Sequence, residues 1–309
     1  MHKDRFFHLL LLIALMLCWG PSFFFIKVAL TEVSPTTIAT IRMGIGSVFL
    51  LLVTVLKKES LLKWRFAFKH FLVITFLLTI LPIYLTNYSE TKITSSLAGI
   101  LNATQPIFAC ILAHYLLETE KFSVKSLTGI CIGFAGILIV FLPSGVEAHH
   151  ERVLGIITML IAALTSSFSA VYIKKFLYQI PGLVCATYQF ILGTLITAPI
   201  ALLVSRDHLF QFPSIKVLAS ISVLGVFGSA VAFILFYYLI KHAGATYVTT
   251  VTLLLPFVAI FLGVVILQEQ VSWNAYVGCV LILTGLTITH SLINLQKIKQ
   301  LFSSRRKPE

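Results

Sequence analysis

Two stretches indicate the fold of this chain: "LNATQPIFACILAHYLLETE" at residues 101–120 and "VTLLLPFVAIFLGVVILQEQ" at residues 251–270. Each is a long apolar run that carries a proline, Pro106 or Pro256, in its first third. A proline inside a helix lacks the N–H that would bond to the carbonyl four residues earlier, so it interrupts the helix. The return of the same feature about 150 residues later indicates an internal repeat.

The composition of the whole chain is that of a membrane protein. Of its 309 residues, 58% are hydrophobic and 11% are charged, and the mean hydropathy is +0.99. A soluble domain usually carries about 25% charged residues. Because the apolar residues come in blocks long enough to cross a hydrocarbon core at about 1.5 Å per residue, we predict an all-α polytopic membrane protein.

Apolar blocks between polar breaks predict ten transmembrane helices. They lie at about 7–28, 35–55, 70–88, 94–117, 125–142, 154–173, 183–204, 215–240, 244–267 and 272–293. The breaks between them are too short for a soluble domain. The first block is long enough to span and has no obvious small-residue cleavage site, so we expect a permanent helix and not a cleaved signal peptide.

The distribution of Lys and Arg predicts the orientation. With both termini in the cytoplasm, most of the 23 basic residues fall in cytoplasmic loops and tails, as the positive-inside rule requires. The net charge of +12 is then explained by basic loops and a basic tail at 294–309 that face an anionic leaflet. We therefore expect a lipid bilayer, specifically a bacterial inner membrane, as the partner of these charges, and no nucleic acid.

The repeat extends over nearly the whole chain. At a spacing of about 150 residues Tyr88 matches Tyr238, and Glu120 matches Glu269. We predict a first five-helix repeat at 1–146 and a second at 147–293. Because five is odd, the second half enters the membrane from the opposite side, which is an arrangement that recurs in transporters with the site near the midplane at the repeat interface.

Several motifs together resemble the EamA-type permeases of the drug/metabolite transporter superfamily. They are "CWGPSFFFIKVAL" at 18–30, "ATIRMGIG" at 39–46, "TSSLAGILNATQPIFACILAHYLLETEKFSVKSLTGICIGFAGILI" at 94–139 and "ATYVTTVTLLLPFVAIFLGVVILQEQVSWNAYVGCVLILTGL" at 245–286. The resemblance implies a ten-helix permease for small metabolites. It also implies that the first, third, fourth, sixth, eighth and ninth helices line a central cavity.

Polar residues at helical spacing lead to each proline. Asn102 and Gln105 precede Pro106, and Thr249 and Thr252 precede Pro256. Residues three apart share a helix face, and we expect these four side chains to line a substrate cavity, with the two prolines acting as helix breaks for gating. The alternative is polar glue between helices.

Other polar or aromatic residues inside the spans are further cavity candidates. They are Trp19 and Ser22 in the first span, Tyr84 in the third, Ser166, Ser169 and Tyr172 in the sixth, and Tyr238 in the eighth. A tyrosine near a span end is more often an interfacial anchor, and Tyr84 is the deepest of the tyrosines.

Arg42 is the one charged residue predicted to lie well inside a span, which makes it a functional candidate by default. It lies one to two turns from the outer end, within snorkelling distance, so we favour a structural role in which it pairs with the outer loops. All 11 acidic residues fall at span ends, in loops or in tails. The sequence therefore offers no mid-membrane carboxylate for proton or sodium coupling, unlike the small multidrug pumps of the same superfamily.

Glycines and cysteines in the spans have packing interpretations. Gly129, Gly133 and Gly136 form a small face that lets the fifth helix approach a neighbour closely, and Gly278 and Gly285 do the same in the tenth. The five cysteines fall in apolar segments without a close pair. We expect no metal site, no cofactor and no catalytic constellation.

The pattern as a whole predicts a secondary transporter, and not an enzyme, that moves a small polar metabolite by alternating access. We favour export or exchange of an amino acid or related compound. Two alternatives stay open: uptake of a complex S-adenosylmethionine- or nucleotide-like metabolite, and a lipid-handling membrane protein. Whether the chain forms a homodimer is also left open.

Overall fold

The structure is a computed structural model that describes residues 2–116, 124–142, 149–204, 213–243, 248 and 250–304. Side chains are described for 6–116, 127–142, 150–204, 213–243, 248 and 251–288. Every regular element of this described part is helical, which confirms the all-α prediction.

The described residues of the first half form ten helical elements. In chain order they are α1 (His2–Trp19), α2 (Ser22–Ala29), α3 (Pro35–Leu56), η1 (Leu62–Ala67), α4 (Phe68–Ile74), η2 (Thr75–Ile80), α5 (Leu81–Ser89), α6 (Ser95–Asn102), α7 (Gln105–Leu116) and α8 (Val124–Val140).

The described residues after residue 146 are also helical. Their elements are α9 (His149–Tyr172), η3 (Ile173–Leu177), α10 (Gly182–Val204), α11 (Ile215–Gly225), η5 (Val226–Val231), α12 (Ala232–His242), η6 (Thr250–Leu253), α14 (Leu255–Val265) and α15 (Trp273–Ser304).

Seven helical stretches of the described chain, some with a short break inside them, are long and apolar enough to cross a membrane. They are Phe6–Ala29, Pro35–Leu56, Leu62–Ser89, Ser95–Leu116, His150–Leu177, Gly182–Val204 and Ile215–His242. Three shorter apolar helices lie at Leu127–Val140, Val251–Val265 and Trp273–Ile288. The chain is therefore an integral membrane protein. The count of ten crossings and the inverted relation of the two halves stay predictions.

Side-chain caps explain where several helices begin. Ser34 accepts a hydrogen bond from the Thr37 N–H at the start of α3, and Pro35 follows it at the first helical position. Thr94 caps α6 in the same way, and Ser214 caps α11. Such caps bond N–H groups that the first turn of a helix leaves without a partner, and proline is tolerated there because its missing N–H is not needed.

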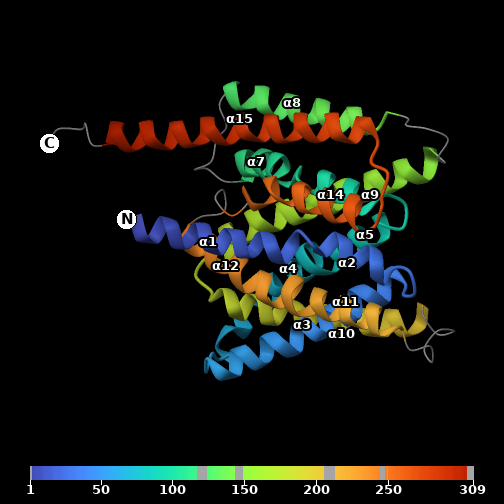
Figure 1. The fold of residues 1–309 in the computed structure, drawn as a ribbon. Coiled ribbons are helices and arrows are strands. Elements are labelled where there is room, and N and C mark those ends of the chain that lie inside the picture. The colour runs from blue at the N-terminus through green and yellow to red at the C-terminus, as the bar shows by residue number, and fades with distance from the viewer. Residues whose placement is uncertain are drawn as a thin grey trace.

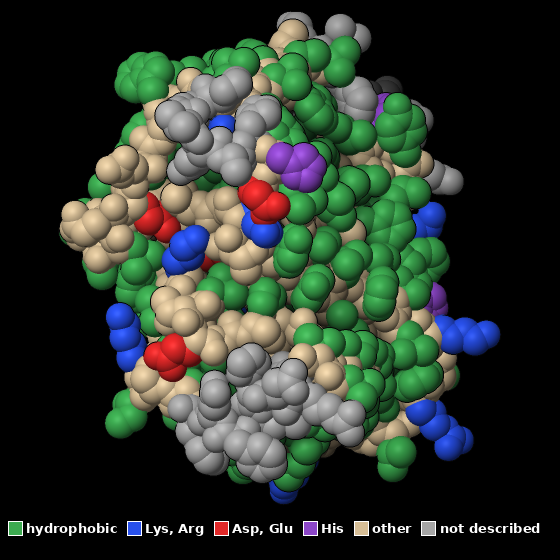
Figure 2. Space-filling model, turned by 90° about the vertical axis from the view of Figure 1, so that its right-hand side faces the viewer, with side chains coloured by type: hydrophobic (Ala, Val, Ile, Leu, Met, Phe, Trp, Pro, Cys, Tyr) green, Lys and Arg blue, Asp and Glu red, His purple; other side chains and the backbone are tan. Residues whose placement is uncertain are grey.

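The helices lie side by side in one bundle with α8 and α15 along one edge and α3 and α10 along the opposite edge (Figure 1). The first residues of α1 and the last of α15 lie at the same end of the bundle (Figure 1). Figure 2 shows the other end, where acidic and basic side chains are spread among polar atoms while hydrophobic side chains cover the flanks. An apolar surface next to an end that carries charged side chains matches the profile of a bilayer.

Glycines allow close contact between α8 and α15. A Cβ added at Gly136 would lie 2.7 Å from the Gly278 carbonyl oxygen, and one added at Gly285 would collide with the backbone of Gly129 and Gly133. The predicted packing role of these glycines is confirmed.

The two largest apolar cores of the described residues hold most of the bundle together. One includes Leu78, Phe190 and Phe233 and joins α1, α3, α10 and α12. The other includes Phe23 and Ile107 and joins α6, α8, α9, α14 and α15. A cavity inside the bundle takes lining residues from both of them, so it lies where the two cores meet.

Candidate functional site

Two interrupted helices provide the polar part of the site. The fourth apolar segment breaks between α6, which ends at Asn102, and α7, which starts at Gln105 with Pro106 as its second residue. The ninth breaks between η6 and α14, and Pro256 is the second residue of α14. Both breaks lie where the prolines predict them, because neither proline can donate to the preceding turn.

The break at Asn102 is held in shape by hydrogen bonds of its own. The Gln105 Nε2 donates to Asn102 Oδ1 at 2.6 Å. The Ser167 hydroxyl from α9 donates to the Gln105 carbonyl at 2.8 Å. No described N–H donates to the Asn102 carbonyl across the break, so this acceptor is available to a ligand or a water.

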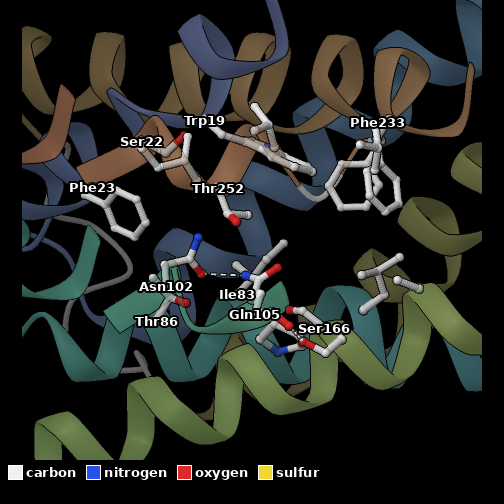
Figure 3. A pocket seen from close by; sticks show the side chains of 18 of the residues that line it. Trp19, Ser22, Phe23, Ile83, Thr86, Asn102, Gln105, Ser166, Phe233 and Thr252 are labelled. Atoms are coloured by element: carbon white, nitrogen blue, oxygen red, sulfur yellow. Dashed lines mark hydrogen bonds between the residues drawn. The ribbon is translucent and has the colours of Figure 1, made fainter. Parts of the chain in front are cut away.

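A cavity of about 130 Å³ lies between the two breaks (Figure 3). A single water molecule needs about 10–15 Å³, so there is room for a small metabolite. The uncharged polar part of its lining consists of Ser22, Thr86, Asn102, Gln105, Ser166, Ser167 and Thr252. The apolar part consists of Trp19, Phe23, Ile26, Leu78, Pro82, Ile83, Ala109, Ala170, Phe233, Phe236, Val248, Val251 and Leu255.

Three aromatic rings form one wall of the cavity. The Trp19 ring meets Phe233 edge-on with centroids 6.0 Å apart, and it lies tilted against Phe236 at 5.5 Å. Phe190 supports Phe233 from behind at 5.0 Å. This wall faces the polar side chains of Asn102 and Gln105 across the cavity (Figure 3). Such a site suits a ligand with a polar end and an apolar or planar body.

Arg42 is the only charged residue among the described residues that line the cavity. Its Nε donates to Ser229 Oγ at 2.7 Å, and its Nη2 donates to the Gly228 carbonyl at 2.8 Å. The prediction that Arg42 pairs with the outer loops is wrong, because the guanidinium turns inward to η5 and only 6% of the residue is exposed. The wide π-helical turn of η5 presents a carbonyl and a hydroxyl that satisfy it within the bundle.

Neither of these two bonds uses Nη1, the second terminal nitrogen of Arg42. Because the residue also borders the cavity, this nitrogen is available to an anionic group of a ligand.

Most of the cavity candidates named from the sequence are brought together. Those that line the cavity are Trp19, Ser22, Asn102, Gln105, Ser166 and Thr252. They come from the first, fourth, sixth and ninth of the predicted segments, and they point toward one another (Figure 3).

Four other candidates lie outside the lining. Tyr84 is 37% exposed and stacks on Tyr88, and Tyr238 is 38% exposed and stacks on His242. The Tyr172 hydroxyl is hydrogen-bonded to His70 Nδ1 at 2.7 Å. Ser169 is buried and donates to the carbonyl of Thr165 in its own helix. Thr249 lies outside the described residues.

The sequence reasoning missed Thr86, Ser167 and the phenylalanines of the aromatic wall. In the third segment it selected the tyrosine, whereas the lining face carries Leu78, Pro82 and Thr86. The spacing of four residues between these positions is a helical signal. This spacing was not recognised in the sequence because the residues on the other faces of the same helix are also apolar.

The polar residues at the start of α6, Ser95 and Ser96, contact the segment that follows α14 and do not line the cavity. The Glu269 carboxylate, which follows α14, accepts hydrogen bonds from the Ser95 N–H at 2.7 Å and the Ser96 N–H at 3.0 Å. The Ser96 hydroxyl donates to the same carboxylate at 2.7 Å. A side chain at Gly99 would collide with Ala259 of α14. In this part of α6, the polar residues therefore form hydrogen bonds between helical segments and do not line the cavity, which is the alternative interpretation given above.

The carboxyl group of Glu90 is buried, although its position at a span end suggested contact with water. Glu90 follows the last residue of α5, at a span end as expected, but its exposure is 0%. A position at a span end does not by itself place a carboxyl in water, because loops and neighbouring helices can cover it.

The fold and the site together define a class: a polytopic α-helical membrane protein with a central polar and aromatic cavity at two interrupted helices. The sequence profile of the EamA-like transporter family matches residues 6–142 and again residues 153–290. The chain belongs to the EamA-like transporter family.

Curated relatives agree with this assignment. An "uncharacterized transporter" of Archaeoglobus fulgidus is 24% identical over 87% of this chain and 94% of its own length. YoaV of Bacillus subtilis, also named an uncharacterized transporter, is 22% identical over 93% of this chain and 98% of its own. YedA of Escherichia coli, named an uncharacterized inner membrane transporter, is 25% identical over 84% and 83%.

Among solved structures, one crystal structure of a protein superposes with a TM-score of 0.64 over 92% of this chain and 98% of its own. At 17% sequence identity this likeness concerns the fold alone.

Proposed function

We propose that this chain is a secondary transporter that moves a small polar metabolite across a bacterial inner membrane by alternating access. The observation that carries the proposal is the cavity between the two helix breaks, with amide and hydroxyl groups on one side and aromatic rings on the other. Interrupted helices at a repeat interface are where secondary transporters bind their substrates.

The relation between the halves supports a mechanism of two similar parts. A π-helical turn at Thr75–Ile80 has a counterpart at Val226–Val231, about 150 residues further on. The breaks before Pro106 and Pro256 have the same spacing. Two halves with π-helical turns and helix breaks at matching positions can exchange conformations, so that the cavity opens first to one side and then to the other.

One end of the bundle is closed by contacts between segments that such a motion would separate. Glu269 joins the end of α14 to the start of α6. The Lys27 ammonium of α2 donates to the backbone carbonyls of Glu90 at 2.7 Å and Ile93 at 2.9 Å. With both termini in the cytoplasm, this is the outer end, and we propose that these bonds form the outer gate.

The substrate class follows from the cavity in general terms. Polar groups from Asn102, Gln105, Ser166 and Thr252 suit an amino acid or a related compound, moved by export or exchange. The alternative is uptake of a larger S-adenosylmethionine- or nucleotide-like metabolite, whose planar base would lie against Trp19. A lipid-handling role fits less well, because a lipid path does not need this polar lining.

The proposal is tested by comparing metabolites inside and outside bacterial cells that express the chain. An Asn102→Ala/Gln105→Ala variant, compared at an equal amount of folded protein in the membrane, is the control that removes the amides from the cavity. A compound that crosses the membrane only with the intact protein identifies the substrate and the direction of transport together. If no compound separates the two strains, in the expression host or in a host that contains nucleoside-type metabolites, the proposed transport is contradicted.

A substrate-free prediction concerns access to the cavity. In a chain without its native cysteines, Asn102→Cys and Thr252→Cys are expected to react with a water-soluble maleimide, because both side chains line the same cavity and the proposed transport requires that cavity to open to water. Labelling is measured by mass spectrometry of protein in vesicles. Ala259→Cys, which is buried between α14 and α6, is the unreactive control. If both cavity positions react as slowly as position 259, the cavity is not open to water.

A further inference from the structure

Glu90 is a buried titratable group that the proposed transport mechanism does not use. Its exposure is 0%, and neither carboxyl oxygen has a hydrogen-bond partner among the described residues. The hydroxyl of the nearby Ser95 is also buried, with no partner in the described part of the chain. A buried carboxylate without hydrogen bonds is strongly unfavourable, and such a group usually becomes neutral by binding a proton.

The charged groups that act electrostatically on Glu90 come from three segments, and a fourth, α9, packs against α5 beside it. Lys27 on α2 and Arg42 on α3 attract its ionised form, and Glu269 after α14 repels it. The Lys27 ammonium is hydrogen-bonded to two backbone carbonyls, one of them that of Glu90 itself, and not to the carboxyl group. From α9, Glu151 is engaged in an ion pair with Lys92.

Burial is the largest influence on Glu90 and raises its pKa well above the ordinary value, against the opposing attraction of Lys27. The proton on Glu90 therefore leaves at a higher pH than that of an exposed glutamate, whose pKa is about 4.3.

Arg42 connects this group to the cavity. It lines the cavity and also interacts electrostatically with Glu90. When Glu90 is ionised, its negative charge reduces the positive potential that the Arg42 guanidinium produces in the cavity. When Glu90 is neutral, Arg42 presents its full charge to an anionic ligand, and Nη1 is available to bond it. Two negative groups close to one guanidinium oppose each other, so an anion in the cavity favours the protonated form of Glu90.

We propose that Glu90 is a proton-binding site linked through Arg42 to the cavity, so that a proton and a substrate with an anionic group such as a carboxylate bind cooperatively. By thermodynamic reciprocity the proton raises the affinity for the anion by the same factor as the anion raises the affinity for the proton. The anion part of this inference rests on the proposed transport function, whereas the proton site does not.

The proton site is tested without a substrate, by infrared difference spectroscopy of the purified protein in lipid vesicles as the pH is raised. A buried protonated carboxyl has a carbonyl band above the amide region. This band is expected in the intact protein at pH values at which an exposed glutamate has already lost its proton, to disappear in Glu90→Gln, and to shift in Glu90→Asp. Glu32→Gln is the matched control, because the Glu32 carboxyl at the same end is exposed and bonded to Ser214. An intact protein without the band, or a band that survives in Glu90→Gln, overturns the proton site, whether or not the chain transports anything.

Linkage to the cavity is tested with benzoate and its neutral analogue benzamide in a thermal-shift assay at two pH values, one below and one above the midpoint of the infrared titration. Benzoate is expected to raise the melting temperature of the intact protein more at the lower pH. In Glu90→Gln, which stays neutral, the benzoate shift is expected to be equal at the two values, and benzamide should show no pH dependence in either protein. A pH-independent benzoate shift in the intact protein, or no shift at all, overturns the linkage. If the infrared band and the linkage are found but no metabolite moves, the proton site stands and the proposed transport fails.

Discussion

Substitution of Arg42 by lysine is expected to lower transport of an anionic substrate at least tenfold. A single ammonium group cannot replace the fork that donates from Nε to Ser229 and from Nη2 to the Gly228 carbonyl while Nη1 is left for the ligand. A buried polar group left without its partner costs about 1–3 kcal/mol, and about 1.4 kcal/mol corresponds to a factor of ten. The measurement is initial transport rate divided by the amount of protein in the membrane.

A substitution that only lowers stability is expected to leave the transport rate per folded molecule unchanged, unlike Arg42→Lys. Arg152→Lys is the matched control, because Arg152 is also buried and donates to the backbone carbonyls of Val140 and Leu142, yet it does not line the cavity. We expect Arg152→Lys to lower the melting temperature and to keep the transport rate per folded molecule. Equal rates for Arg42→Lys and the intact protein would show that Arg42 is only a structural residue.

Substitution of Glu269 by glutamine is expected to open the end of the bundle that lies away from the termini. The carboxylate accepts the Ser95 and Ser96 N–H groups and the Ser96 hydroxyl, and its charge lies at the positive end of α6. An amide offers one acceptor instead of two and turns its NH₂ toward a donor. Hydrogen bonds to charged groups contribute about 1.5–3 kcal/mol each, so the equilibrium between the closed and open forms is expected to shift by at least tenfold.

The shift is measured as the rate at which a membrane-impermeant maleimide labels Asn102→Cys from the outer side, with and without Glu269→Gln. A rise of about tenfold is expected. Glu32→Gln is the control at the same end, because its carboxylate joins the exposed Ser214 and does not touch α6. An unchanged labelling rate in Glu269→Gln would mean that these bonds do not hold the end closed.

The class of the fold could be predicted from the sequence because the signals for it are local. Hydropathy over some twenty residues marks a span, and the described apolar helices lie at the predicted stretches. The breaks next to Pro106 and Pro256 follow from the missing N–H of one residue. The glycines of α8 and α15 meet because a small residue every three or four positions produces a flat helix face.

The rotation of each helix about its own axis was harder to predict. In the third segment nearly every side chain is apolar, some facing lipid and some facing protein, so periodicity does not distinguish the two faces. The polar tips of tyrosines drew attention to Tyr84, while Thr86 lines the cavity. Ser96 and Asn102 share a row in α6, but α14 covers the first and leaves the second at the cavity.

The order of residues along the chain was enough to establish a helical membrane protein, to predict two similar halves, and to place Asn102, Gln105 and Thr252 at helix breaks. Hydrophobicity and backbone hydrogen bonding act over short distances along the chain, so these features can be read from it. The inward turn of Arg42 to η5 and the full burial of Glu90 at a span end became visible only in the packed bundle. The environment of a charge depends on residues distant in sequence, which for Arg42 are those of η5 and for Glu90 are Lys27 and Glu269, and only the packing of the helices brings them together.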